Sequence, residues 1–355
     1  MKGLILSGGR GTRLRPITYT RAKQLVPVAN KPVLYYGLEA LVAAGIEDIG
    51  IVVGDTQAEI RAAVGDGSRW NARVTYIEQD APRGLAHAVL ISEAFIAGDP
   101  FVMYLGDNLL NHGITRLVAE FDRERPAAQI LLAHVPDPQM FGVAELADGR
   151  VVRLVEKPAA PQSDLALVGV YMFGRDVFES VKEIQPSARG ELEITDAIQH
   201  LIDRGLEVRP QIVDGWWKDT GKLEDLLEAN RLILDTFEPC IEGSVDAESR
   251  IEGKVVVSPG AVIERSVVRG PAVIGAGARI VQAYVGPFTA IGARAEIRET
   301  EIEHSIVLEE ARITNLAARI EDSLIGRNVT ICRLPVRPSA YRFMLGDNSE
   351  VGIRW

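Results

Sequence analysis

Near its beginning the chain combines glycines with a dense group of cations. The apolar run at 4–6 stops at Gly8, Gly9 and Gly11. The cations that follow are Arg10, Arg13, Arg15, Arg21 and Lys23. Glycine lets backbone N–H groups approach a phosphate closely because no Cβ intervenes, and cations offset the charge of a polyphosphate. The stretch therefore predicts a nucleoside triphosphate, held by its phosphates at the end of a first strand.

The two best-known phosphate loops do not account for this stretch. A P-loop would need Gly-Lys followed by Ser or Thr, and a dinucleotide fingerprint would need a third glycine where the chain has Leu14. An ordinary glycine turn with solvated arginines is the alternative. The number of nearby cations, together with Lys23 and Gln24, favours the phosphate site.

Two aspartates that follow predicted strands are candidate magnesium ligands. Asp107 comes directly after the apolar run 101–105, and Asp219 follows two tryptophans and a lysine at 216–218. Magnesium prefers one or two carboxylates together with substrate oxygens and water. Each aspartate is a weak signal by itself, and the two are far apart in the sequence, so that only the fold could bring them together.

The elements that must position these residues alternate in type along the first part of the chain. Apolar runs typical of buried strands lie at 4–6, 49–53, 74–77 and 101–105, and helical patterns lie at 32–44, 56–64 and 85–96. This alternation predicts a doubly wound, Rossmann-like α/β domain. Ligands bind such sheets outside the carboxyl ends of the strands. The loops after residues 6, 53, 77 and 105 are therefore predicted to carry the site.

Beyond residue 127 the pattern changes towards antiparallel strands, which makes the predicted sheet a mixed one. Strands are predicted at 129–134, 141–146, 151–156, 167–173 and 208–213, and helices within 189–203 and 222–236. Asp148-Gly149 is a strong hairpin signal between two of these strands.

The C-terminal third has a different period. Aliphatic residues recur every five or six positions from Val245 to Ile313, and glycines often follow them. This hexapeptide repeat predicts a left-handed parallel β-helix of triangular coils with aliphatic side chains stacked inside. The expected domains are a catalytic domain at 1–240 and a β-helix domain at 241–355. End coils need a cap or a partner chain, so we expect a homo-oligomer, with residues 341–345 as a cap or an interface.

Composition excludes several classes of protein. The formal net charge is −10, from 39 Lys and Arg against 49 Asp and Glu, which argues against binding to nucleic acid or to a membrane surface. No run approaches the length of a membrane span. The two cysteines, Cys240 and Cys332, form neither a disulfide framework nor a zinc motif. A cytoplasmic protein is therefore expected.

The opening stretch also carries a resemblance. Gly-Gly-Arg-Gly-Thr-Arg-Leu at 8–14, followed by Lys-Gln-Leu-Val-Pro-Val at 23–28, resembles the signature of the sugar-1-phosphate nucleotidylyltransferases. The likeness is greatest to the long form of the thymidylyltransferases in that family, and it extends over nearly the whole chain. Ser7 stands where the family pattern usually has alanine, a replacement of one small residue by another.

The resemblance implies a role for each matching residue. Nucleotide contacts are implied for Gly8, Gly9, Gly11, Thr12 and Gln24, with Gln79 and Gly84 reading the base. Arg13 and Lys23 would hold the triphosphate and stabilise charge, and Asp107 and Asp219 would hold Mg²⁺. Sugar hydroxyls would contact Gly142 and Glu156, the sugar phosphate would contact Lys157 and Arg189, and Val168 would line the pocket. His87 is expected to be a packed or surface histidine, because this phosphoryl transfer needs no general base.

The implied reaction joins dTTP to α-D-glucose 1-phosphate, giving dTDP-glucose and pyrophosphate by Mg²⁺-dependent in-line attack. Three alternatives stay open. The enzyme could use UTP or another sugar 1-phosphate, since spacing alone does not fix a methyl group or a hydroxyl. The β-helix could carry an acetyltransferase site, although His304 is its only histidine. An inactive relative is the third alternative, which the presence of Arg13, Lys23, Asp107 and Asp219 opposes.

Overall fold

The computed structural model describes residues 1–9 and 11–333. Contacts divide the chain into two compact units: the first comprises Met1–Arg10, Arg21–Leu25 and Val33–Asp219, and the second comprises Gly11–Thr20, Val26–Pro32 and Thr220–Trp355. This division differs from the expected domains 1–240 and 241–355, because the second unit starts earlier and takes up two short N-terminal segments. Arg10 and the segment 341–345 lie outside the described residues.

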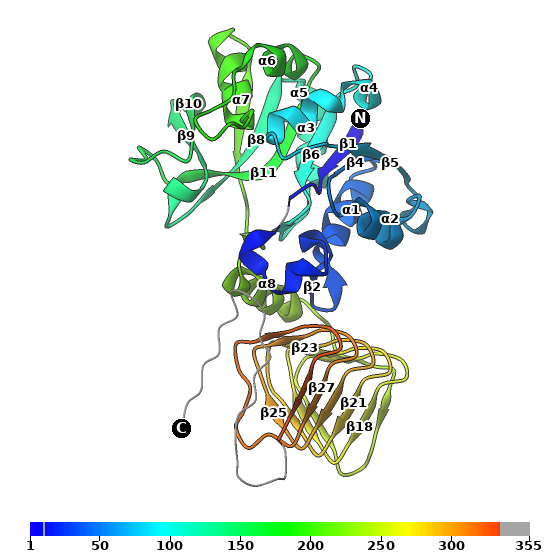
Figure 1. Ribbon diagram of the computed structural model, residues 1–355. Helices are drawn as coiled ribbons and strands as arrows, with labels where there is room; N and C mark the ends of the chain where they lie inside the picture. Colours follow the sequence, from blue (N-terminus) through cyan, green and yellow to red (C-terminus); the bar gives the residue numbers. More distant parts are fainter. Residues whose placement is uncertain (10, 334–355) are drawn as a thin grey trace. The chain divides into compact units, whose positions relative to one another are not determined.

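The first unit is built on a mixed sheet with strand order β10-β9-β11-β6-β1-β4-β5, and β8 and β12 join it beside β11 (Figure 1). Its strands are β1 (Lys2–Leu6), β4 (Asp48–Val53), β5 (Arg73–Glu78), β6 (Phe101–Leu105), β8 (Ala128–His134), β9 (Gly142–Ala147), β10 (Arg150–Glu156), β11 (Leu165–Phe173) and β12 (Val208–Ile212). Strands β6, β1, β4 and β5 are parallel, whereas β11 runs antiparallel to β6. The predicted α/β class and the mixed sheet are confirmed.

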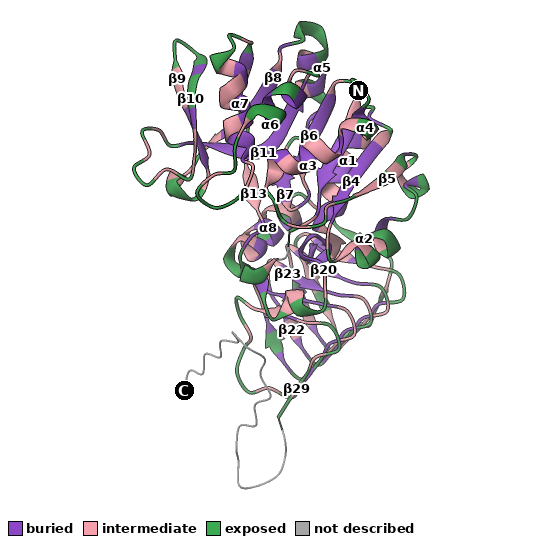
Figure 2. Cartoon of the chain, turned by 45° about the horizontal axis from the view of Figure 1, so that its top comes forward, coloured by how far each residue is buried: buried purple, intermediate pink, exposed green. Residues whose placement is uncertain are grey.

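Helices cover both faces of this sheet, and each face has its own core. The helices are α1 (Val33–Ala43), α2 (Gln57–Val64), α3 (Leu85–Ile91), α4 (Glu93–Ile96), α5 (Thr115–Glu124), α6 (Val177–Glu183) and α7 (Ile194–Asp203). Leu4 and Leu6 of β1 pack with α3, α4, α6 and α7, while Ile5 packs on the other face with α1, α2 and α5. Successive side chains of a strand point to opposite faces, so β1, β4, β6 and β11 are buried on both sides (Figure 2).

Several elements differ from the sequence-based expectation. The helix expected at 85–96 is divided into α3 and α4 at Ser92, whose buried hydroxyl donates to the Ala88 carbonyl at 2.7 Å. Such back-bonding bends helices. Helices α5 and α6 were not predicted. The short 3₁₀ turns η3 (Lys23–Leu25), η4 (Ser68–Trp70) and η5 (Pro138–Met140) were not predicted either.

A two-stranded ribbon outside the main sheet has the greatest consequence for the site. It consists of β7 (Asn108–Leu110) and β13 (Trp217–Asp219), which pair antiparallel with Asn108 opposite Asp219. The Trp217 indole N–H donates to Asn108 Oδ1 at 3.0 Å. This pairing joins the loop after β6 to a segment from the far end of the first unit.

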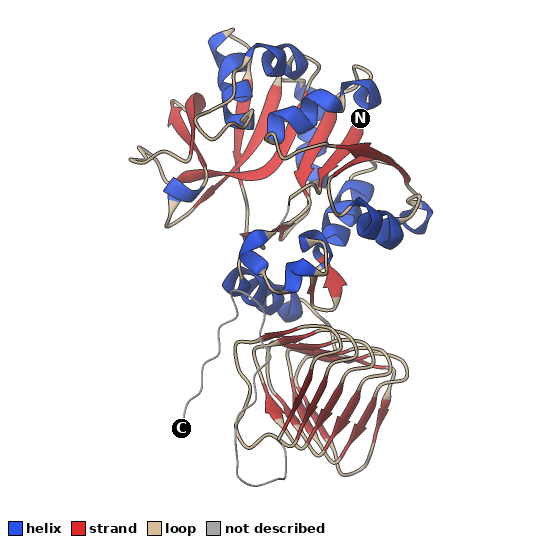
Figure 3. Ribbon diagram, viewed as in Figure 1, coloured by secondary structure: helices blue, strands red, loops and turns tan. Residues whose placement is uncertain are grey.

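The second unit contains a parallel β-helix made of three sheets, as predicted (Figures 1 and 3). One sheet has β14 (Cys240–Ile241), β17 (Val255–Val257), β20 (Ala272–Ile274), β23 (Thr289–Ile291), β26 (Ile306–Val307) and β28 (Leu324–Ile325). The next has β15 (Ser244–Val245), β18 (Val262–Glu264), β21 (Arg279–Val281), β24 (Glu296–Arg298), β27 (Arg312–Thr314) and β29 (Thr330–Cys332). The third has β16 (Arg250–Glu252), β19 (Val267–Arg269), β22 (Tyr284–Val285) and β25 (Glu301–Ile302). The periodic aliphatics from Val257 to Ile313 are fully buried inside it.

The other elements of the second unit are α8 (Leu223–Asp235), the turns η1 (Thr12–Leu14) and η2 (Ile17–Tyr19), and the hairpin of β2 (Pro27–Val28) and β3 (Lys31–Pro32). The hairpin turns at Ala29 and Asn30, which both have positive φ, as a two-residue hairpin loop favours. Asn230 of α8 is fully buried. Its Oδ1 accepts from the Ala29 N–H and its Nδ2 donates to the Phe288 carbonyl, each at 2.9 Å.

Among the helices of the described residues, none is both long enough and apolar enough to cross a membrane.

Candidate active site

The two candidate metal ligands lie on either side of Lys23. The Lys23 ammonium forms an ion pair with the Asp107 carboxylate and lies 3.7 Å from Asp219 Oδ1. Only 8% of the Lys23 side chain is exposed, so little solvent screens these charges. Two carboxylates and one cation, predicted from three distant segments, therefore form a single cluster.

The fold explains how these three side chains meet. Asp107 follows β6, at the carboxyl end of a buried parallel strand, which is the edge where such sheets bind ligands. Asp219 ends β13, and the β7–β13 pairing sets it opposite Asn108, the neighbour of Asp107. Lys23 begins η3, and η3 packs against α1 within the same unit.

The glycine turn lies at the same edge of the sheet. A Cβ at Gly8 would lie 3.2 Å from Gln79 Oε1, and a Cβ at Gly9 would lie 3.7 Å from Gln24 Nε2. Gln24 is buried, and its Oε1 has no hydrogen-bond partner among the described residues. The Ser7 hydroxyl is likewise buried and without a partner there. Buried polar atoms are normally paired, so these two atoms indicate that a polar ligand completes this turn.

Gln79 and Gly84 lie together in the loop between β5 and α3. The Gln79 amide N–H group donates to the Gly84 carbonyl at 3.4 Å and lies 3.0 Å from Nδ1 of His87. Gly84 has a φ of 102°. A Cβ there would collide with the backbone of Leu192, so only glycine fits this position.

This loop is tied to the segment that carries Arg189. The Leu192 N–H donates to the Arg83 carbonyl at 2.8 Å, and the Leu192 carbonyl accepts from the Ala86 N–H at 3.0 Å. Two backbone hydrogen bonds thus join the predicted base-reading loop to the predicted sugar-phosphate segment.

The predicted sugar-phosphate residues form a second charged cluster in the first unit. Glu156 Oε1 lies 3.7 Å from the Lys157 ammonium and 3.5 Å from the Arg189 guanidinium. Gly142 is the register partner of Glu156 across the β9–β10 hairpin. A Cβ at Gly142 would lie 2.6 Å from Thr195 Cγ2 and 3.1 Å from Glu156 Oε2, so the absence of a side chain at Gly142 keeps this corner open.

Opposing effects act on the pKa of Glu156, which lies at the centre of this cluster. Burial raises the pKa of the Glu156 carboxyl, and the neighbouring Glu193 raises it further, while Lys157, Arg189 and a hydrogen bond from Thr195 lower it. The net direction is upward. Arg189 also pairs with Glu191 at 2.6 Å and with Glu193 at 3.2 Å. The guanidinium is therefore held in one orientation by three carboxylates.

The remaining predicted residues have other surroundings. Val168 of β11 is fully buried in the core and lies at the register shift between Leu167 and Tyr171. Gly11, Thr12 and Arg13 belong to the second unit. Gly11 is left-handed and caps η1, and Thr12 and Arg13 are exposed.

Sequence reasoning assigned no contact to three side chains, Asn108, Glu193 and Thr195. It also did not anticipate the contact of His87 with Gln79. Glu193 and Thr195 lie in the helix-opening segment 189–196, where acidic residues had a structural explanation. No sequence signal distinguishes Asn108, because its partner Trp217 is brought to it by the ribbon.

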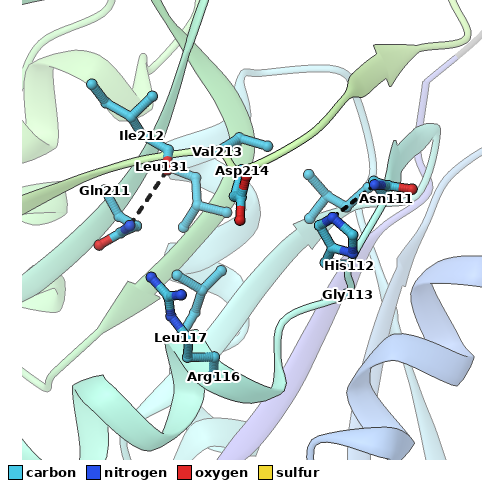
Figure 4. Close-up of a pocket in the computed structure, with 11 residues that line it drawn as sticks. Asn111, His112, Gly113, Arg116, Leu117, Leu131, Gln211, Ile212, Val213 and Asp214 are labelled. Atoms are coloured by element: carbon cyan, nitrogen blue, oxygen red, sulfur yellow. Dashed lines mark hydrogen bonds between the residues drawn. The ribbon is translucent and has the colours of Figure 1, made fainter.

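A separate pocket of about 270 Å³ opens beside β7 and β12 (Figure 4). It is lined by Leu110, Asn111, His112, Gly113, Arg116, Leu117, Leu131, Gln211, Ile212, Val213 and Asp214. The polar side chains of Asn111 and His112 lie 2.8 Å apart on its rim. None of the predicted site residues lines this pocket.

Comparison with known proteins identifies the family of this chain. Residues 2–236 match the nucleotidyl transferase family. A glucose-1-phosphate thymidylyltransferase of Streptomyces antibioticus is 57% identical over 356 residues, which covers 100% of both chains. A glucose-1-phosphate thymidylyltransferase of Streptomyces griseus is 56% identical over 99% of both chains. The low-salt glycan biosynthesis nucleotidyltransferase Agl11 of Haloferax volcanii is 47% identical over 99% of both.

Two solved structures share the fold over about two thirds of the chain. One is described as a glucose-1-phosphate thymidylyltransferase from Bacillus anthracis in complex with a sucrose; its TM-score is 0.62 at 39% identity, over 65% of this chain and 94% of that one. The other, UDP-glucose pyrophosphorylase complexed with UDP-glucose, has a TM-score of 0.59 at 27% identity, over 66% of this chain and 98% of that one. The chain therefore belongs to the nucleotidyl transferase family, and its full-length relatives there include glucose-1-phosphate thymidylyltransferases.

Proposed function

We propose that this enzyme joins dTTP to α-D-glucose 1-phosphate, releasing pyrophosphate and forming dTDP-glucose. The observation that carries the proposal is the convergence of Asp107 and Asp219 on the buried Lys23, at the edge of the sheet where the glycine turn also lies. The names of the full-length relatives support the two substrates. UTP and other sugar 1-phosphates are the alternatives that an assay must exclude.

The donor set fits a magnesium ion shared with substrate. Among residues 1–9 and 11–333, no group of three or more histidine, cysteine, aspartate or glutamate side chains converges to hold a metal by itself. Magnesium characteristically binds through one or two carboxylates and takes its other ligands from phosphates and water. Asp107 and Asp219 would hold it. When bound there, Mg²⁺ would supply positive charge that offsets the charge of the phosphates.

The proposed chemistry depends on positioning rather than on covalent catalysis. Lys157 and Arg189 orient the sugar phosphate, so that one of its oxygens attacks the α-phosphorus in line with the departing pyrophosphate. Lys23 stabilises the negative charge that builds up on the phosphates. The attacking oxygen is already ionised, so no base is required. Glu156 accepts hydrogen bonds from sugar hydroxyls.

A pyrophosphate-release assay tests the proposal. Purified full-length enzyme is given dTTP, dUTP, UTP or dCTP in combination with glucose, galactose or mannose 1-phosphate. We expect the highest kcat/KM for dTTP with glucose 1-phosphate. A higher kcat/KM for UTP, or for another sugar phosphate, would contradict the proposed substrates.

The proposed magnesium ligands are tested separately, by replacing Asp219. Asp219→Asn should raise the Mg²⁺ concentration needed for half-maximal rate by about tenfold and lower the rate, because a carboxylate ligand is lost. Asp235→Asn, at the end of α8, is the matched control and should titrate like the wild type. An unchanged Mg²⁺ titration for Asp219→Asn would reject the assigned ligand.

We also propose that the enzyme is cytoplasmic and that copies assemble through the β-helix, as the need to cover the end coils of a repeat array suggests.

A further inference from the structure

The side-chain amide of Gln79 has only one orientation that its surroundings accept. One end of the amide lies 3.4 Å from the Gly84 carbonyl. A carbonyl oxygen only accepts hydrogen bonds, so the amide nitrogen, not the amide oxygen, must face it. The same nitrogen lies 3.0 Å from Nδ1 of His87.

This arrangement determines the state of the His87 ring as well. Since the Gln79 nitrogen donates, Nδ1 of His87 must accept, and the ring proton is on Nε2. Burial lowers the pKa of His87, and so does the charge of Arg83, while Asp80 raises it. Of the described charged groups, only Arg83 and Asp80 act on this ring, and they pair with each other at 2.6 Å. The imidazole is therefore neutral near pH 7, as the contact requires.

The other end of the amide is directed towards the glycine turn. Gln79 Oε1 would lie 3.2 Å from a Cβ at Gly8, so the missing side chain at Gly8 leaves this oxygen accessible. Among the described residues no donor bonds to Gln79 Oε1. With its nitrogen held by Gly84 and His87, Gln79 presents a hydrogen-bond acceptor to whatever base lies over the turn.

We propose that His87 is a positioning residue that sets pyrimidine selectivity: it holds the Gln79 amide so that the oxygen faces the base. Thymine and uracil carry an N–H at N3, which an acceptor oxygen binds. Cytosine has a lone pair at N3, which the same oxygen repels. The site thereby accepts imide bases and rejects cytosine. This inference rests on the proposed function, because it needs a pyrimidine nucleotide in this loop.

The test uses two variants of the full chain and three nucleotides. Dissociation constants for dTTP, dUTP and dCTP are measured by calorimetry. His87→Ala leaves only the longer contact with the Gly84 carbonyl, at 3.4 Å, to hold the amide. The preference for dTTP over dCTP should then fall about tenfold, the effect of losing one specific hydrogen bond. His87→Asn can place an oxygen where Nδ1 was and should restore most of the preference. The ratio of dTTP to dUTP should not change, since neither variant touches the methyl group.

A pH titration of the wild type gives a measurement that does not depend on how a variant folds. Protonated His87 donates from both nitrogens, so Nδ1 no longer accepts from the Gln79 amide, and the amide loses the shorter of its two contacts. The preference for dTTP over dCTP should therefore weaken as the pH falls from about 8 to 5. A constant preference over that range, or His87→Ala with wild-type preference, overturns the inference. Wild-type enzyme that fails to bind dTTP overturns the proposed function, and the inference with it.

Discussion

The two units use charged side chains in contrasting ways. In the first unit Lys23 is almost fully buried between Asp107 and Asp219. In the β-helix several ion pairs stand on the surface and join neighbouring coils, as Arg294 does with Glu310 at 2.7 Å. Exposed pairs of this kind contribute little to stability, whereas a buried cluster is costly to assemble and needs every member.

The difference follows from how each unit is specified. Each coil of the β-helix repeats its predecessor, so Glu310 lies over Arg294 because the two are one coil apart. The buried cluster of Lys23, Asp107 and Asp219 has no such repeat. Its three members come from η3, the loop after β6 and the end of β13, and only the complete sheet and ribbon bring them together. In the β-helix, the contacts that stabilise a coil come from its neighbouring coils. In the first unit, the buried cluster forms only when the whole unit is folded.

The largest expected effect tests the buried cluster. Lys23→Ala should lower kcat about 10³-fold, because a cation that stabilises the developing phosphate charge is lost. Arg294→Ala removes a cation from the β-helix surface and should leave kcat unchanged. Both variants are assayed by pyrophosphate release, and circular dichroism checks that each is folded. If the kcat of Lys23→Ala were within threefold of the wild-type value, the buried cation would matter no more to the rate than the surface cation, and the contrast between the two units would be wrong.

A smaller effect tests Asn230, a buried polar side chain that links α8 to the hairpin and to the β-helix. Asn230→Ala leaves the Ala29 N–H and the Phe288 carbonyl without their partner. The expected loss is about 2–4 kcal/mol in the free energy of unfolding. Hydrogen exchange at the Ala29 amide should also become faster. Arg231→Ala, at an exposed position of the same helix, is the control, and equal exchange in the two variants would show that Asn230 does not hold the hairpin.

The smallest effect compares one carboxyl group from each unit across pH. Glu156 has a raised pKa in the folded protein, first because of burial, so it costs stability as the pH rises through the window between its unfolded and folded values. Asp246 of the β-helix has a lowered pKa, chiefly because the Ser249 hydroxyl donates to it. It contributes stability above its unfolded pKa and loses that contribution as the pH falls through the folded value.

Neutralising these two carboxyls should therefore have opposite results. At pH 7 Glu156→Gln should raise the melting temperature by about 2 °C, and Asp246→Asn should lower it slightly. Both differences should close in acid, where the wild-type carboxyls are themselves protonated. Thermal melts of the three proteins between about pH 3 and 8 provide the measurement. If the melting temperatures of Glu156→Gln and Asp246→Asn shifted in the same direction at pH 7, the opposite pKa shifts assigned to these two carboxyls would be wrong.

Much of the fold is predictable from the sequence, because the aliphatic residues of the β-helix repeat and the strands and helices of the first unit alternate. The spacing of Ile263, Ile280 and Ile297 predicts an interior stack, and all three are fully buried. Strands such as β6 are predictable because a short apolar run fits a strand that is buried on both faces. Helix α3 ends early because a buried serine hydroxyl bonds to the backbone, which no hydrophobic pattern reports.

The candidate site is less predictable from its residues. Strands β7 and β13 are too short to show a period, so the pairing that unites Asp107 with Asp219 had no pattern of its own. The contact of Gln79 with His87 crosses a turn whose shape depends on Gly84. Family resemblance supplied candidates for these positions, and side-chain geometry explains which of them work together.

The two hydrogen bonds at Leu192 have a consequence for how such an enzyme could diversify. They are made by the main chain, so they do not depend on the identity of the Leu192, Arg83 or Ala86 side chains, provided that position 84 stays glycine. The spacing between the proposed base-reading loop and the Arg189 segment is thereby independent of the side chains proposed to recognise the sugar. Replacements around Glu156 could change the preferred sugar while the base preference stays as it was. The same backbone could in this way give rise to catalysts for many pairs of nucleotide and sugar.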